Sequence, residues 1–248
     1  MSGVGLRLSG IGHDYGTLPV LDGIDLDIRP GEVTVLGGPS GCGKSTLLGI
    51  MGGLIAPARG TVTQRGTAAA ECLNPLTYVF QDFALLPWRT VEGNVSLVLE
   101  GQPLTRAARA ARIAEVLAVT GLAEFATAWP RQLSGGMRQR VGIARALAVR
   151  PAVLLMDEPL SALDAQTRDL LLDEFAAVIA RSGATVVYVT HNLHEAVRLG
   201  TRVVVLSRRP GRIRATVTVE GDRAALEAHL WSLIRDDAAA AARELADG

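Results

Sequence analysis

The chain has 248 residues, 48% of them apolar and 20% charged, so it can bury a substantial core and is too apolar to be disordered. Lysine and arginine number 25, as do aspartate and glutamate, and this zero net charge argues against a nucleic-acid backbone as the main partner. Two cysteines are too few for a disulfide framework, and no signal-peptide pattern opens the chain, which favours a reducing cytoplasm.

The first elements in the chain are short and β-rich. Residues 6–11 and 23–28 are apolar runs punctuated by glycine, with no long helical pattern between them. They predict an antiparallel β layer, and residues 60–79 are a candidate extension of it.

Further along, strand-sized apolar runs alternate with longer helical patterns. The pairs are 32–36 with 45–51, 152–156 with 165–181, and 185–189 with 193–199. This alternation predicts an α/β fold with a mostly parallel sheet covered by helices. Every apolar run is too short to cross a bilayer, so we expect any membrane association to be made through a partner.

A different pattern separates these strands. Between residues 81 and 134 the sheet pattern lapses, and residues 105–120 have helical apolar spacing, with Thr105 to cap the start and Gly121 the end. We therefore divide a single domain, 1–248, into a core with its β layer (1–80 and 151–221), an inserted, mainly helical subdomain (81–150) and a helical tail (222–248).

A glycine-rich loop lies between the strand at 32–36 and the following helix. It fits the pattern G-x-x-x-x-G-K-[ST] and consists of Gly38, Pro39, Ser40, Gly41, Cys42, Gly43, Lys44 and Ser45, with Thr46 next. In this context the backbone N–H groups can surround a β-phosphate, Lys44 can neutralise the β and γ oxygens, and Ser45 can bind Mg²⁺. The alternative is a glycine-rich turn with a solvated lysine. We interpret Cys42 as a small filler, because attack by water on a phosphate needs no thiol.

Two carboxylates and a histidine follow neighbouring apolar strands. Asp157 and Glu158 end the run at 153–156, and His191 follows the run at 185–189. Since open α/β sheets bind ligands at the carboxyl ends of their strands, we expect Asp157 to hold Mg²⁺, Glu158 to activate water and His191 to reach the γ-phosphate. Acidic residues after a strand can also be solvated loop starters, and a histidine there can be structural.

A second helix N-terminus with backbone N–H groups free to bind an anion is predicted at residues 133–140, where Ser134, Gly135 and Gly136 precede Gln139. With the motifs above, it resembles the signature of the ABC ATPases, whose other motifs follow in the family's order over nearly the whole chain. The resemblance implies a P-loop NTPase fold, an ATPase activity with Mg²⁺, and four further assignments: Gln81 as a residue that contacts ATP and the metal, Asp164 in the D-loop at 161–164, His191 as the switch histidine, and Tyr15 as the aromatic that stacks on adenine.

The resemblance also implies partners. In this family two copies form a head-to-tail homodimer, in which Ser134, Gly135, Gly136 and Gln139 of one subunit close on the γ-phosphate held by Lys44 of the other. A separate membrane permease is implied, at the cytoplasmic face of the membrane, and residues 81–88 and 206–213 resemble the nitrate, sulfonate and taurine importers, which add an extracytoplasmic solute-binding protein. Three alternatives stay open: a soluble ABC ATPase acting on nucleic acid or the ribosome, the ATPase of another importer or an exporter, and a P-loop kinase.

Overall fold

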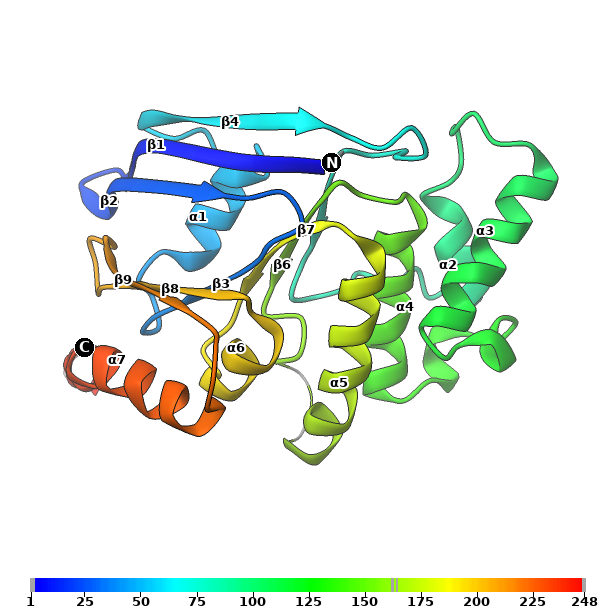
Figure 1. Cartoon of the computed structure of the whole chain (residues 1–248). Coiled ribbons are helices and arrows are strands. Elements are labelled where there is room, and N and C mark those ends of the chain that lie inside the picture. Colours follow the sequence, from blue (N-terminus) through cyan, green and yellow to red (C-terminus); the bar gives the residue numbers. More distant parts are fainter. Residues whose placement is uncertain (1–2, 162, 164, 247–248) are drawn as a thin grey trace.

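The computed structural model describes residues 3–161, 163 and 165–246. Its first layer is a small antiparallel sheet, drawn in blue and cyan in Figure 1, with the strand order β2-β1-β4. The strands are β1 (Gly3–Tyr15), β2 (Leu18–Ile28) and β4 (Arg59–Thr67). The predicted antiparallel β layer is therefore confirmed.

The second layer is a six-stranded sheet with the order β5-β6-β7-β3-β8-β9. All neighbouring strands are parallel except β9, which is antiparallel to β8. Its strands are β3 (Val33–Gly37), β5 (Leu76–Val79), β6 (Val153–Asp157), β7 (Thr185–Val189), β8 (Arg202–Leu206) and β9 (Ile213–Thr218). The extension of the β layer to residue 79 is thus wrong in its last part, because β5 pairs with β6 along the edge of this sheet.

The central strands β3, β6 and β7 are mostly apolar, and all their residues except Asp157 are buried, because both faces of the sheet are covered. Val35 and Leu154 belong to a core shared with the helices, whereas the next residues, Leu36 and Leu155, belong to a core shared with the antiparallel layer. Successive side chains of a strand point to opposite faces, so the continuous apolar runs in the sequence fill two cores at once.

Helices cover the large sheet on both sides. The helix α1 (Lys44–Met51) packs between the two sheets, while α5 (Ala165–Ser182), α6 (Leu193–Leu199) and α7 (Arg223–Ala246) lie on the opposite face (Figure 1). The segment between β5 and β6 carries α2 (Val91–Leu97), α3 (Arg106–Val119) and α4 (Gly135–Ala148), with short 3₁₀ turns at Ala123–Phe125 and Pro130–Gln132.

The helix α3 forms where the sequence predicts one. The Oγ1 atom of Thr105 accepts a hydrogen bond from the N–H of Ala108 at 3.1 Å, and Gly121 follows the helix with φ +67°. In the described part of the chain, no helix is both long and apolar enough to span a membrane.

Candidate nucleotide site

The glycine-rich loop joins β3 to α1 and has a backbone that only glycine adopts without strain. Gly38 has φ +144° and Gly43 has φ +100°. A Cβ atom on Gly43 would lie 2.8 Å from Cδ2 of Leu21 and 3.2 Å from the carbonyl oxygen of Val20. The antiparallel layer therefore presses directly against the loop, and glycine is required there for its conformation as well as for space.

Lys44, the first residue of α1, is buried and its side chain reaches back to the start of the loop. Its Nζ atom donates hydrogen bonds to the carbonyl oxygens of Gly38 and Pro39, both at 2.8 Å. These bonds offset the cost of burying the ammonium group and fix its position. Cys42 is 1% exposed and burial raises the pKa of its thiol, which fits its interpretation as a packing residue.

A cavity of about 660 Å³ opens beside the loop. It brings together residues from six segments of the chain: the end of β1, the start of β2, the loop with α1, the residues that follow β6 and β7, and the segment before β9. Among the expected site residues its wall contains Tyr15, Ser40, Gly41, Gly43, Lys44, Ser45, Thr46, Glu158 and His191. Tyr15 is 52% exposed and stands edge-on to His13, with ring centroids 4.7 Å apart.

Ser45 and Asp157 meet next to this cavity. The Ser45 hydroxyl donates to Oδ1 of Asp157 at 3.0 Å, and the Tyr78 hydroxyl donates to Oδ2 at 3.3 Å. Burial raises the pKa of Asp157, although these two hydrogen bonds offset part of the effect. A hydroxyl and a desolvated carboxylate are oxygen donors suited to Mg²⁺, which takes few protein ligands and completes its shell with water and phosphate. The described residues contain no cluster of three His, Cys, Asp or Glu side chains suited to a metal ion.

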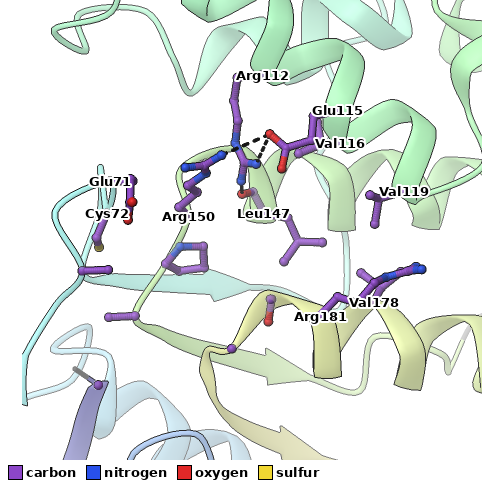
Figure 2. Close-up of a pocket in the computed structure, with 16 residues that line it drawn as sticks. Glu71, Cys72, Arg112, Glu115, Val116, Val119, Leu147, Arg150, Val178 and Arg181 are labelled. Atoms are coloured by element: carbon purple, nitrogen blue, oxygen red, sulfur yellow. Dashed lines mark hydrogen bonds and ion pairs between the residues drawn. The ribbon is translucent and has the colours of Figure 1, made fainter. Parts of the chain in front are cut away.

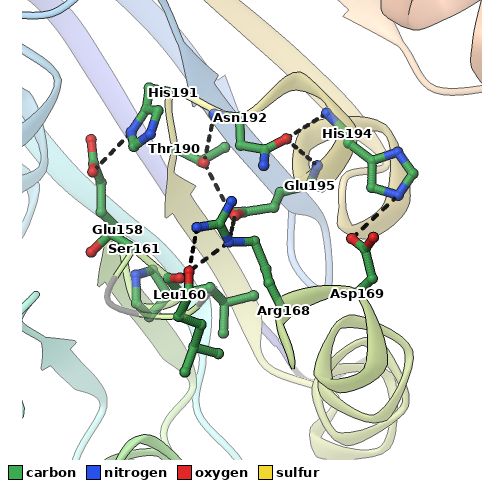
Figure 3. Close-up of polar contacts among 12 residues, drawn as sticks. Glu158, Leu160, Ser161, Arg168, Asp169, Thr190, His191, Asn192, His194 and Glu195 are labelled. Atoms are coloured by element: carbon green, nitrogen blue, oxygen red, sulfur yellow. Dashed lines mark hydrogen bonds and ion pairs between the residues drawn. The ribbon is translucent and has the colours of Figure 1, made fainter. Parts of the chain in front are cut away.

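Glu158 departs from the strand geometry immediately after β6. Its φ of +44° is rare for a residue with a side chain, and strain of this kind is often found at functional sites. Its Oε2 atom lies 3.0 Å from Nδ1 of His191 (Figure 3). The structure therefore brings together the two groups that the sequence places at the ends of β6 and β7.

Gln81 lies apart from these groups. Its amide nitrogen donates to Oγ of Ser161 at 3.3 Å, and Gln81 does not contribute to the wall of the cavity. Its assignment as a ligand of the metal and of ATP stays a prediction. Asp164, the expected D-loop residue, lies outside the described residues.

The helix α4 begins as the sequence predicts. Ser134 caps it, accepting a hydrogen bond from the N–H of Met137 at 3.2 Å, and Gly135 and Gly136 form its first turn. None of the three lines the cavity beside Lys44. Gln139 differs from the expectation: it is 2% exposed and its amide donates to the carbonyl oxygen of Pro159 in the same chain, so it has no free surface to offer a partner subunit.

Two residues of the site were missed from the sequence. The Tyr78 hydroxyl binds Asp157 from β5, a strand that the sequence pattern places in the antiparallel layer but that pairs with β6. Arg209 lines the cavity from the segment before β9. In the sequence, residues 206–213 indicate only a resemblance to the nitrate, sulfonate and taurine importers and no contact with the site. That segment reaches the cavity because Gly211 donates its N–H to the carbonyl oxygen of Val20 at 2.8 Å and accepts one from Asp22 at 3.1 Å.

A second cavity, of about 470 Å³, lies at the opposite end of the strands, beside Pro151 and Ala152 before β6 (Figure 2). Glu115 of α3 bridges Arg112 at 2.7 Å and Arg150 at 3.3 Å. Arg112 also donates to the carbonyl oxygen of Ala148, at 2.9 Å, at the end of α4. These charges fasten α3 to the end of α4, and the cavity is separate from the site around Lys44.

Comparisons with known proteins agree with this arrangement. The sequence profile described as "ABC transporter" matches residues 21–161. An aliphatic sulfonates import ATP-binding protein of Xanthomonas axonopodis pv. citri is 44% identical, covering 95% of this chain and 96% of its own. A taurine import ATP-binding protein of Rhizobium johnstonii is 46% identical, covering 81% and 77%.

Solved structures give the same result. The dimeric cassette MJ0796 bound to ADP and Pi, a post-hydrolysis state, has a TM-score of 0.72 at 32% identity, covering 88% of this chain and all of its own. Another dimeric structure of MJ0796, described as a bacterial ABC transporter cassette, has a TM-score of 0.73 at 33% identity with the same coverage. The chain belongs to the ABC transporter family, as an ATP-binding and ATP-hydrolysing member.

Proposed function

We propose that the chain is the MgATP-hydrolysing subunit of an importer for sulfonate- or taurine-type anions, acting with a second copy of itself and a separate permease. The observation that carries this proposal is the cavity of about 660 Å³, in which Lys44, Glu158 and His191 meet at the carboxyl ends of β3, β6 and β7. A cavity of this volume suits a nucleotide.

Each residue has a role that follows from its place. The loop N–H groups and Lys44 bind the phosphates, and Ser45 and Asp157 would hold Mg²⁺, which offsets the charge that develops on the phosphate oxygens. Glu158 orients water and takes its proton, and His191 holds the Glu158 carboxylate at 3.0 Å and faces the γ-phosphate. Tyr15 at the mouth of the cavity offers a ring on which adenine stacks.

The homodimer is part of the proposal because the two anion-binding helix starts, those of α1 and α4, lie apart within a single chain. The start of α4 lies outside the cavity that holds Lys44. Both structural relatives are described as dimeric. In a head-to-tail dimer, Ser134, Gly135 and Gly136 of one subunit close the nucleotide site of the other.

A mixing experiment tests this composite site. Lys44→Ala removes the loop function and Ser134→Arg blocks the signature, so each variant alone should lack ATPase activity. A heterodimer of the two contains one site with both parts intact, and we expect the mixture to recover part of the wild-type rate. A mixture as inactive as its components would contradict a site shared between subunits.

A surface for the permease lies beside α4. Phe80 and Trp88 are 53% and 70% exposed, and a cavity of about 470 Å³ lies between β5, α4 and the segment around Phe83. Large apolar side chains are costly to expose and commonly mark an interface. We propose that a cytoplasmic segment of the permease docks here, so that the subunit sits at the cytoplasmic face of the membrane.

The loop that presents Trp88 is fixed by hydrogen bonds to one buried side chain. Asn94 is fully buried and accepts a hydrogen bond from the N–H of Leu86 at 2.8 Å. Its amide group donates to the carbonyl oxygens of Leu86, Arg89 and Thr90, at 3.1, 3.0 and 3.0 Å. A side chain that binds both ends of residues 86–90 fixes the loop as a rigid surface.

The proposed cargo rests on the names of the relatives, which are sulfonate and taurine import proteins. A binding protein outside the cytoplasm would select the cargo. The test is growth on taurine or an alkanesulfonate as the sole sulfur source. The cells have this chain and its permease as their only uptake system for these compounds. Growth that persists with Glu158→Gln would contradict the assignment.

A further inference from the structure

Beneath the site, a buried ion pair joins α5 to α6. Nε of Arg168 lies 3.4 Å from Oε1 of Glu195, and the two side chains are 19% and 4% exposed. Neither residue lines the nucleotide cavity. Burying a carboxylate this deeply is costly unless each of its oxygens is bound, so its other contacts show what the pair holds.

Glu195 holds the turn that carries His191. Its Oε2 atom accepts hydrogen bonds from the hydroxyls of Tyr188 and Thr190, both at 2.8 Å. The Thr190 hydroxyl in turn accepts the N–H of Asn192 at 3.0 Å. The residues on both sides of His191 are therefore bound, directly or through one hydroxyl, to a single carboxylate (Figure 3).

Arg168 holds the segment that follows Glu158. Its Nε atom donates to the carbonyl oxygen of Leu160 at 3.3 Å, and its Nη2 atom donates to that of Leu163 at 2.7 Å. Within this segment Ser161 donates its N–H to the carbonyl oxygen of Glu158 at 3.1 Å. The guanidinium group thus fixes the backbone directly after the strained Glu158.

We infer that Arg168 and Glu195 are a positioning pair for hydrolysis, which holds the turn of His191 and the segment after Glu158 in one fixed relation. The pair keeps His191 and Glu158 at their 3.0 Å separation, although neither residue of the pair lines the nucleotide cavity. An apolar pair of the same volume would pack in this place, but it could not bind two hydroxyls and two backbone carbonyls at once. The inference rests on the proposed roles of Glu158 and His191.

The test is the steady-state kinetics of phosphate release by the full-length chain over a range of MgATP concentrations. Glu195→Gln keeps the shape of the side chain but removes the charge that holds Arg168. We expect kcat to fall about tenfold, with KM for MgATP changed by less than about twofold, since the phosphate loop is untouched. Arg168→Met should have the same effect, and the double variant should lose no more than either single variant, because the residues act as one unit.

A matched control exists between the same two helices. Arg198 of α6 pairs with Asp173 of α5, and the Asp173 side chain is 71% exposed. Asp173→Asn removes an ion pair that has no link to His191 or Glu158, so kcat should stay at the wild-type value. Thr190→Val provides a milder test at one hydroxyl, and Thr190→Ser, which restores that hydroxyl, should recover kcat.

The outcomes are separable. If Glu195→Gln and Thr190→Val lower the melting temperature but keep kcat at a temperature where both are folded, the pair serves only stability and the inference is wrong. If Thr190→Ser is as slow as Thr190→Val, the hydroxyl is not the cause and the inference is also overturned. Failure of the proposed function itself looks different, because Glu158→Gln would then keep its turnover.

Discussion

The phosphate loop offers the sharpest structural prediction, the change Gly43→Ala. Gly43 has φ +100°, where a residue with a Cβ atom costs about 1–3 kcal/mol. The added atom would also lie 2.8 Å from Leu21 and 3.2 Å from the backbone of Val20, and a backbone oxygen cannot move aside as a flexible side chain does. The loop must therefore shift away from β2, which displaces its N–H groups from the phosphates. At about 1.4 kcal/mol for each factor of ten, the strain alone predicts a loss of MgATP affinity of roughly tenfold to a hundredfold.

Calorimetric titration with MgATP, together with thermal unfolding, measures this loss. Gly31→Ala is the matched control, because Gly31 also has a positive φ, +73°, but a Cβ atom there would meet nothing within 4 Å. The control should lose stability and keep wild-type affinity. Wild-type affinity in Gly43→Ala would refute the argument that close packing against β2 shapes the loop.

Three further predictions concern single side chains. Arg209→Ala should raise KM for MgATP by no more than about fivefold, because Arg209 is an exposed cation on the cavity wall. The increase in KM should be smaller at high salt. An unchanged KM at low salt would show that Arg209 does not belong to the site. Iodoacetamide at neutral pH should modify Cys72 before Cys42, since Cys42 is 1% exposed and burial raises the pKa of its thiol. Peptide mass spectrometry measures the order of modification, and the reverse order would contradict the burial of Cys42. Trp88→Ala should leave ATP binding intact and reduce co-purification with the permease, whereas Trp231→Ala, at a position on α7 that is 55% exposed, should not. Equal co-purification of both variants would show that Trp88 only covers the core.

Much of the fold could be predicted because periodic patterns carry it. The runs that form β3, β6 and β7 are mostly apolar, as a sheet covered on both faces requires, and Thr105 marks the start of the helix at 105–120. The phosphate loop and the carboxylates could be found because they lie at the ends of those runs. Their meeting at one edge of the sheet follows from the parallel order of the strands.

The remainder depended on tertiary pairing, which local patterns do not contain. The strand β5 is only four residues long, and nothing in it distinguishes pairing with β6 from pairing with the antiparallel layer. Because Tyr78 lies in β5, its contact with Asp157 could not be predicted either. Arg209 was missed because it reaches the cavity only through the hydrogen bonds between Gly211 and β2. The burial of Gln139 depends on its contact with Pro159, twenty residues away in the sequence.

The most direct test of the account compares the wild-type chain with Glu158→Gln. The amide can still hydrogen-bond water but cannot take its proton, and Lys44 and the loop are unchanged. We therefore expect MgATP affinity within a few-fold of the wild type, phosphate release lowered by about 10²- to 10⁴-fold, and an ATP-dependent dimer that is stable in size-exclusion chromatography. Phosphate release at the wild-type rate would contradict the role of Glu158, and with it the account of the site.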